Sequence, residues 1–293
     1  MGDGQANRVN RSVREARAKG TELSRTAATR GAEIGRNAAS RGAEMGRNMR
    51  NIDVPWARCG PARAARESIL QFVLAPLMDL YTRPRVSGRE VFRNLPHPVI
   101  LVANHSSHLD TPTILRALPL QWRQRTAVAA AADYFYKKRA VANTVALIFN
   151  TVPLMRQGGG VNNGATEHVD RLIDQRWNLL LFPEGTRSRD GRLGKMRSGA
   201  AAIAQAHGIP IVPIFVKGTH DAMPPGRNWP KKRRFLSRRH RVEVHFGQPI
   251  WPKHDEGRHE VMNRVRTFLE DEAGTGAGPK FTRRRERAAA PVV

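Results

Sequence analysis

Short apolar runs recur through the middle of this chain, separated by polar stretches. Each run has the length of a strand, and the predicted strands cover residues 99–103, 126–131, 151–155, 178–182, 209–216 and 242–246, of which 178–182 is expected to be buried on both faces. The run at 209–216 contains two prolines. Because proline cannot donate to a sheet ladder, an irregular or edge course is predicted for that strand.

Apolar residues at helical spacing fill the segments between these runs. The clearest case has Val169, Leu172, Ile173 and Trp177 on one face with charges opposite. Further helices are predicted at residues 110–118, 141–149, 198–208 and 259–269. Strands alternating with helices from about residue 90 to 270 predict an α/β fold: a single, mostly parallel sheet flanked by helices.

Residues 67–81, ESILQFVLAPLMDLY, are the most apolar stretch before this region, and Pro76 interrupts them. The stretch is too short to span a bilayer. It suits a helix that lies in a membrane interface or covers a lipid pocket, and it equally suits an ordinary core helix.

The chain ends are basic. Residues 1–52 contain an eleven-residue repeat, RTAATRGAEIG from Arg25 and RNAASRGAEMG from Arg36, that fits either a disordered tail or an arginine-edged helix on an anionic membrane. Residues 273–293 are glycine-rich and then basic, which predicts disorder. The folded domain is therefore expected to cover residues 53–272.

The charge balance narrows the class of partner. The chain has 50 Lys and Arg against 25 Asp and Glu, a formal charge of +25, which favours nucleic acid, an anionic membrane surface or a phosphorylated substrate. Its single cysteine, Cys59, excludes an intrachain disulfide and a cysteine-based zinc site, so a reducing cytoplasm fits. Neither an apolar leader nor a run of 18 apolar residues is seen. The expected location is cytoplasmic, peripheral on the inner face of the cell membrane.

The strand at 99–103 runs directly into NHSSHLD, residues 104–110, and a helix is predicted to start at Asp110. In an open α/β sheet such a loop leaves the carboxyl end of its strand, where ligands bind. A tight turn lets the Asp110 carboxylate hold one nitrogen of His105 and leaves the other as a general base. A structural histidine is the alternative, and a zinc site made by His105, His108 and Asp110 is another.

A second polar loop, FPEGTRS, follows the strand at 178–182. Arg187 has planar donors that match a phosphate, Thr186 and Ser188 supply hydroxyls, and Gly185 permits close approach of the backbone. Arg156, before the glycines 158–160, is a further phosphate candidate, with Lys195 and Arg197 ranked lower.

NHSSHLD followed by FPEGTRS resembles the glycerolipid acyltransferase family, whose members include the 1-acylglycerol-3-phosphate acyltransferases. The likeness covers roughly residues 85–250, with residues 152–156 at the place of the family's second block and IVPI at 211–214 similar to its fourth. Leu154 and Met155 before Arg156 depart from the family pattern, so Arg156 is the weaker match. The resemblance implies His105 and Asp110 as catalytic residues. It implies substrate binding by Arg156, Glu184, Gly185, Thr186, Arg187 and Ser188, with Glu184 holding a hydroxyl or orienting Arg187, or forming a structural salt bridge.

The implied reaction moves a fatty acyl group from acyl-CoA or acyl carrier protein to the free hydroxyl of 1-acylglycerol-3-phosphate in phospholipid biosynthesis. No cofactor is expected beyond this acyl thioester co-substrate, and the expected partners are the lysophospholipid acceptor and an anionic membrane. The acceptor can instead be another lysolipid or a glycolipid. In a different class, the basic segments, including residues 231–241, fit a nucleic-acid-binding protein without catalysis, although no recognised nucleic-acid module is present.

Overall fold

The computed structural model describes residues 54–131, 139–154, 167–227, 229–231, 239–253 and 255–274. Contacts within the chain define a compact unit of residues 53–156 and 170–293 and a second unit of residues 1–52 and 157–169. The predictions for the eleven-residue repeat, the C-terminal tail, the glycines 158–160 and Arg156 lie outside the described residues. The fold of the larger unit follows.

The described residues form a seven-stranded sheet with strand order β1-β7-β6-β2-β5-β3-β4. Every neighbouring pair is parallel except β6 and β7, so the predicted mostly parallel sheet is confirmed. The strands are β1 (Thr82–Ser87), β2 (Ile100–Ala103), β3 (Thr126–Ala131), β4 (Thr151–Leu154), β5 (Asn178–Leu181), β6 (Ile211–Lys217) and β7 (His240–Phe246).

The run predicted as a strand at 209–216 forms β6, which begins at Ile211 and so contains Pro213 but not Pro210. β6 lies inside the sheet between β7 and β2, so the prediction of an edge course was wrong. Ile211 exchanges main-chain hydrogen bonds with Ile250 on the β7 side of β6. Pro213 is two residues further along, so its backbone nitrogen points to the same side, away from β2. The antiparallel pairing with β7 starts only at Ile214 and Phe246. Pro213 therefore removes no bond to β2, and its carbonyl accepts one from the Gly247 N–H at 2.8 Å.

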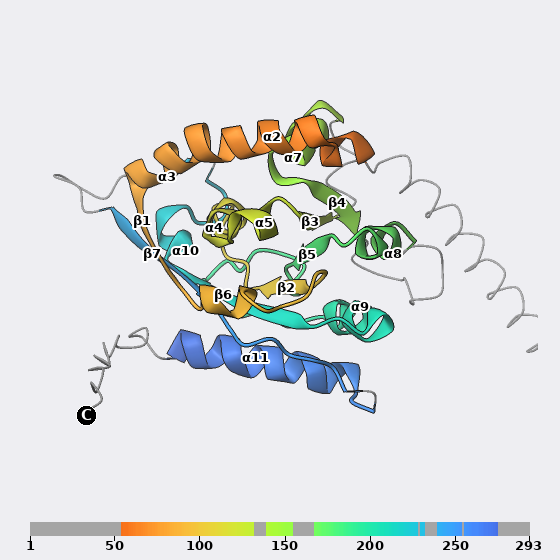
Figure 1. Cartoon of the computed structure of the whole chain (residues 1–293). Coiled ribbons are helices and arrows are strands. Elements are labelled where there is room, and N and C mark those ends of the chain that lie inside the picture. Colours follow the sequence, from red (N-terminus) through yellow and green to blue (C-terminus); the bar gives the residue numbers. More distant parts are fainter. Residues whose placement is uncertain are drawn as a thin grey trace, which may run out of the picture. The chain divides into compact units, whose positions relative to one another are not determined.

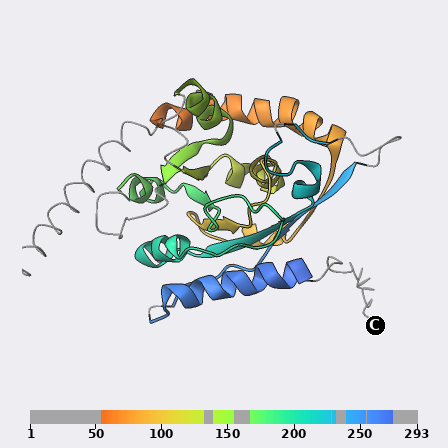
Figure 2. The same ribbon diagram turned by 180° about the vertical axis from the view of Figure 1, so that it is seen from behind.

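Helices cover both faces of this sheet (Figures 1 and 2). On one side lie α9 and α11, which pack against β6, and on the other lie α4 and the long helix before β1. The helical elements are η1 (Pro55–Arg58), α2 (Gly60–Ile69), η2 (Leu70–Leu74), α3 (Ala75–Tyr81), η3 (Arg89–Phe92), α4 (Asp110–Ala117), α5 (Leu120–Arg123), α7 (Arg139–Phe149), α8 (Glu167–Asp174), α9 (Gly199–His207), α10 (Thr219–Ala222) and α11 (Arg258–Gly274).

The main hydrophobic core lies where β2, β6 and β7 meet α4 and α5. Trp122 is almost fully buried there, and its ring centroid is 4.8 Å from that of Phe92. Phe92 also meets Phe246 edge to face at 5.0 Å. These large side chains fix α4, and with it the loop before α4, on the sheet.

The apolar stretch at 67–81 belongs to one long helix in which α2, a π-helical turn (η2) and α3 follow without a break. In a regular α-helix the ring of Pro76 would meet the Phe72 carbonyl, and the wider turn before the proline avoids that clash. Two bidentate ion pairs, Arg116 with Asp79 and Arg123 with Glu67, tie this helix to α4 and α5. In the described part of the chain, no helix combines the length and apolar character needed to cross a membrane.

Candidate active site

The two motif loops leave neighbouring strands. β2 and β5 run parallel with Leu101 opposite Leu180, so the loops that follow them emerge at the same edge of the sheet. The His105 N–H donates to Glu184 Oε1 at 2.9 Å, and the Ser188 N–H donates to the His105 carbonyl at 2.8 Å. The two motif loops are therefore in direct contact.

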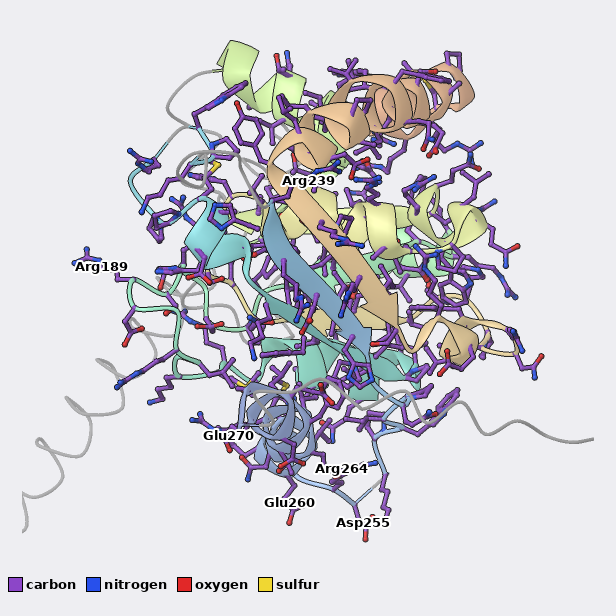
Figure 3. The ribbon with its side chains drawn as sticks, turned by 90° about the vertical axis from the view of Figure 1, so that its left-hand side faces the viewer. Arg189, Arg239, Asp255, Glu260, Arg264 and Glu270 are labelled. Atoms are coloured by element: carbon purple, nitrogen blue, oxygen red, sulfur yellow. The ribbon has the colours of Figure 1, made fainter. Side chains whose placement is uncertain are left out.

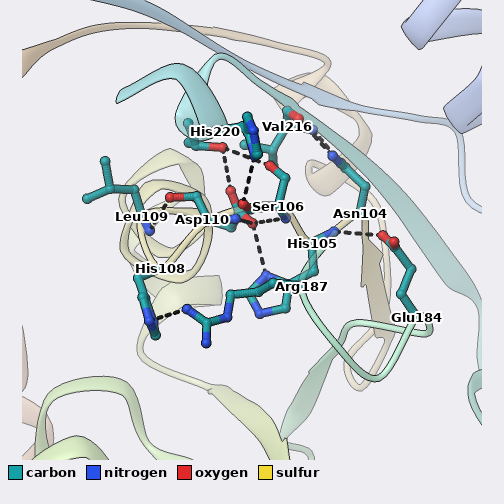
Figure 4. Close-up of polar contacts among 12 residues, drawn as sticks. Asn104, His105, Ser106, His108, Leu109, Asp110, Glu184, Arg187, Val216 and His220 are labelled. Carbon is teal, nitrogen blue, oxygen red and sulfur yellow. Dashed lines mark hydrogen bonds and ion pairs between the residues drawn. The ribbon is translucent and has the colours of Figure 1, made fainter. Parts of the chain in front are cut away.

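His105 and Asp110 form a hydrogen-bonded pair, with Nδ1 of the imidazole 2.9 Å from Asp110 Oδ2 (Figure 4). The same oxygen accepts the N–H groups of Ser106 at 2.7 Å and Ser107 at 2.8 Å, which closes the loop into a tight turn at the start of α4. An ionised carboxylate only accepts, so the imidazole proton sits on Nδ1. Nε2 has no hydrogen-bond partner among the described residues and is left to accept a proton.

The imidazole of His105 is also held by its ring face. The Phe182 ring stacks on it with centroids 4.1 Å apart and planes 22° apart. The His105 side chain is 19% exposed, whereas that of Asp110 is fully buried. A buried, fully bonded carboxylate behind a partly exposed imidazole is the arrangement that a general base requires.

Glu184 joins the two loops through main-chain groups. Its Oε1 accepts from the His105 N–H, and its Oε2 accepts from the Gly194 N–H at 2.9 Å. Burial raises the pKa of the Glu184 carboxyl, and these two hydrogen bonds partly offset that rise. Both carboxylate oxygens therefore hold main-chain groups around the site, and the substrate contact of Glu184 stays a prediction.

Arg187 contacts the first motif through His108. Its guanidinium donates to Nε2 of His108, which must therefore be neutral. Burial lowers the pKa of His108, and the adjacent positive charge of Arg187 lowers it further. His108, three residues after His105 in the same loop, thus acts as a neutral acceptor that orients the Arg187 guanidinium.

Residues 83–217 match a family model described as Acyltransferase. By this match, residues 83–217 form an acyltransferase domain. The match covers both motif loops and β1 to β6 of the sheet, so the resemblance read from NHSSHLD and FPEGTRS is confirmed. The domain is that of an acyltransferase.

Among curated proteins, the chain is 31% identical over 142 residues to "1-acyl-sn-glycerol-3-phosphate acyltransferase BAT2, chloroplastic" from Brassica napus, covering 48% of this chain and 39% of that protein. It is 29% identical over 145 residues to "Taffazin" from Dictyostelium discoideum, covering 44% of this chain and 48% of that protein. The matched region thus spans less than half of these two curated relatives.

Among solved structures, the crystal structure of the 1-acyl-sn-glycerophosphate acyltransferase PlsC from Thermotoga maritima matches 73% of this chain and 84% of that chain with a TM-score of 0.52. The two sequences are 24% identical. This likeness shows that the acyltransferase fold is shared.

The remaining residues of the second motif, Gly185, Thr186 and Ser188, differ in their exposure and contacts. Gly185 has φ +72°, and a Cβ there would lie 3.2 Å from Nε of Arg197, so glycine suits the turn. Thr186 is exposed, whereas the Ser188 hydroxyl donates to Asp190 Oδ1 at 2.9 Å. Lys195 is exposed. The proposed substrate contacts of these residues stay predictions, as does that of Arg156.

His105, His108 and Asp110, the ligands of the zinc alternative, do not gather around one point. His105 bonds Asp110, whereas His108 turns to Arg187. Within the described ranges, no three histidine, cysteine or acidic side chains gather closely enough to hold a metal ion.

Side chains that the sequence patterns did not single out complete the acyltransferase site. Asn104 exchanges two hydrogen bonds of 2.8 Å with the main chain of Val216 and locks the end of β2 to β6. Thr219, just after β6, donates to Asp110 Oδ1 at 2.5 Å, and His220 Nδ1 lies 3.3 Å from the Ser106 carbonyl. The order of the strands would have identified them, because β6 is the parallel neighbour of β2 and its loop opens at the same edge.

Proposed function

We propose that the protein transfers a fatty acyl group from an acyl thioester to the free hydroxyl of 1-acylglycerol-3-phosphate and so forms phosphatidic acid. The observation that carries this proposal is the His105–Asp110 pair, with its free Nε2, beside a loop whose Arg187 is held within the same constellation. The acyltransferase family of residues 83–217 supports the reaction class. The name of the Brassica napus relative, a 1-acyl-sn-glycerol-3-phosphate acyltransferase, supports the acceptor.

The reaction needs a base because an alcohol is a poor nucleophile until its proton is removed. Nε2 of His105 takes that proton as the hydroxyl oxygen attacks the thioester carbonyl carbon. The tetrahedral intermediate collapses, the carbon–sulfur bond breaks, and the leaving thiolate takes the proton back from the imidazolium. Asp110 holds the Nδ1 proton throughout and stabilises the positive charge on the ring.

Arg187 binds the phosphate of the acceptor in this proposal. A guanidinium held from one side by His108 still presents donors to an oxyanion, and its planar fork matches phosphate. Thr186 offers an exposed hydroxyl beside it, and Arg156 is a further candidate. The anionic head is thereby anchored while the glycerol hydroxyl lies at His105.

The donor is acyl-CoA or acyl carrier protein, and no cofactor is proposed. The test is an acyl-transfer assay that pairs labelled acyl thioesters of both kinds with lysophosphatidate and with other lysolipid and glycolipid acceptors. We expect lysophosphatidate to be the best acceptor. Because a relative is named Taffazin, lysophospholipids without a terminal phosphate belong in the panel, and a clear preference for one of them would overturn the acceptor assignment.

We further propose that the protein works at the inner, cytoplasmic face of the cell membrane, bound peripherally to anionic lipid. The long helix before β1 supports this, because its outer side is apolar: Phe72 is 77% exposed, Val73 58% and Leu80 61%. Its inner side is apolar too, with Leu70 and Met78 buried. A water-facing helix normally has a polar outer face, and an apolar one calls for a lipid or protein partner.

Charge favours lipid as that partner. Arg83, near the start of β1 and directly after α3, lies opposite Arg241 near the start of β7. Arg239 precedes β7 at the same end of these two strands (Figure 3). Trp229 is 57% exposed and donates through Nε1 to the Tyr81 hydroxyl at the end of α3. Exposed apolar side chains bordered by arginines and a tryptophan are the composition of a surface that enters an anionic bilayer.

A further inference from the structure

Thr219 supplies the fourth hydrogen bond to the Asp110 carboxylate. Asp110 Oδ2 is shared among His105, Ser106 and Ser107, whereas Oδ1 accepts from the Thr219 hydroxyl. In the part of the chain that the structure describes, this hydroxyl is the one partner of Oδ1. Both side chains are fully buried, so water does not substitute for it.

The fold places Thr219 precisely where β6 ends. Gly218 has φ +84°, and a Cβ there would lie 2.0 Å from the Arg241 carbonyl oxygen, so only glycine fits the turn between strand and helix. Thr219 then opens α10, and the Met223 N–H bonds its carbonyl at 2.8 Å. Its hydroxyl proton points to Asp110, which leaves its oxygen free to accept from Ser106 Oγ at 3.4 Å.

We propose that Thr219 is a positioning residue for acyl transfer: it fixes the rotation of the Asp110 carboxylate and thereby the tautomer of His105. Without the hydroxyl, a buried oxygen has no donor, and the carboxylate turns to share its other contacts. Nδ1 of His105 then loses its fixed acceptor, and the tautomer with its proton on Nε2, which cannot act as a base, becomes populated. This inference rests on the proposed function.

The kinetic test compares substitutions of the same size at two buried threonines. Thr219→Val removes the hydroxyl, Thr219→Ser keeps it, and Thr113→Val is the control. Thr113 is buried on α4, the helix that Asp110 opens, and its hydroxyl has no hydrogen-bond partner among the described residues. Thr113→Val therefore makes the same chemical change without removing a bond.

We expect Thr219→Val to lower kcat roughly ten- to a hundredfold, the usual effect of losing a hydrogen bond to a charged group, with KM for the acceptor within about twofold. Thr219→Ser should restore kcat to within about threefold, because the donor returns. Thr113→Val should match the wild type. An unchanged kcat in Thr219→Val, or a loss no greater than that in Thr113→Val, would overturn the proposal. Thr219→Ala takes the place of the valine variant if that variant does not fold, with the same expectations.

A second readout needs no substrate. In ring ¹⁵N–¹H spectra of protein labelled at histidine, assigned with His105→Asn, the wild type should carry the His105 proton on Nδ1 alone, and Thr219→Val should show both tautomers. Identical spectra would overturn the positioning role. If the wild type catalyses no acyl transfer, the proposed function fails, and these spectra still decide the role of Thr219.

Discussion

The His105 main-chain N–H donates to Oε1 of Glu184, a residue 79 positions further along the chain, at a distance of 2.9 Å. The Glu184 side chain of the second motif therefore holds the main chain of the first motif, next to the His105 imidazole. Glu184 also holds Gly194, so its carboxylate is the common anchor of three segments around the site. The loop bearing Arg187 keeps its place relative to His105 through this anchor.

Replacing Glu184 with Gln should destabilise the protein and slow acyl transfer. The amide oxygen of glutamine can accept from one of the two main-chain N–H groups, but its NH₂ group then faces the other N–H. A donor left without an acceptor in this partly buried site costs about 1–3 kcal/mol. Thermal unfolding measures the loss, at roughly 2–4 °C for each kcal/mol in a protein of this size. Glu260→Gln is the matched control, because among the described residues that side chain bonds the Gly257 N–H alone, at an exposed position.

The difference in stability between the wild type and Glu184→Gln should depend on pH, with a definite sign. Because burial raises the pKa of the folded Glu184 carboxyl above its ordinary value of 4.5, the folded state binds the proton more tightly than the unfolded state. The contribution of this group to stability is complete below pH 4.5 and is lost as pH rises through the folded pKa. The melting-temperature gap between wild type and Glu184→Gln should therefore widen as pH is lowered from 7. A gap independent of pH would contradict the burial-driven shift.

His105→Ala should abolish most acyl transfer and leave the fold intact. The substitution removes the base, worth typically about 10²–10⁴ in rate, while the main-chain bonds of residue 105 to Glu184 and Ser188 persist. Single-turnover assays and circular dichroism check the two halves of this expectation. Substantial residual turnover by folded protein would show that another group takes the proton.

His108→Ala should raise KM for the acceptor several-fold and change kcat little, because it releases Arg187 rather than the base. In the wild type this KM should rise in acid, since protonated His108 cannot accept from a guanidinium, and its lowered pKa places that rise below pH 6.5. The His108→Ala profile should lack the rise. His207→Ala on α9, a histidine paired with Asp170, is the control, and an equal effect there would refute the assignment.

The sequence was sufficient for the parts of this site that lie within one short segment. NHSSHLD places a carboxylate where a tight turn returns it to the imidazole, and the apolar runs that precede the two motifs, at 99–103 and 178–182, have the length of buried strands. Local pattern and motif therefore predicted the α/β sheet and the His105–Asp110 pair.

The contacts that it missed depend on strand order, which no local pattern encodes. Thr219 reaches Asp110 only because β6 lies beside β2, and Asn104 bonds Val216 for the same reason. The misplaced edge strand has a related cause. Pro213 is tolerated inside the sheet because β7 has already ended beside it, a fact about a strand that comes later in the chain.

Removing the exposed apolar side chains of the long helix should weaken membrane binding. Phe72→Ser, Val73→Ser and Leu80→Ser combined should lower the partition coefficient onto anionic vesicles by at least about a hundredfold, since each buried side chain of this kind contributes about 1.5–3 kcal/mol. Cosedimentation at high salt makes the test specific, because salt screens the attraction of the basic chain ends and leaves the apolar contribution.

Trp251→Ser is the control for this triple variant. Trp251 is another exposed aromatic residue, and its carbonyl bonds Arg264 of α11, which covers the opposite face of the sheet from α2 and α3 (Figure 1). The control should bind vesicles as the wild type does. Equal losses in both variants would point to a nonspecific effect of surface polarity. Tighter binding of the wild type to duplex DNA than to anionic vesicles at moderate salt would assign the positive charge to nucleic acid instead.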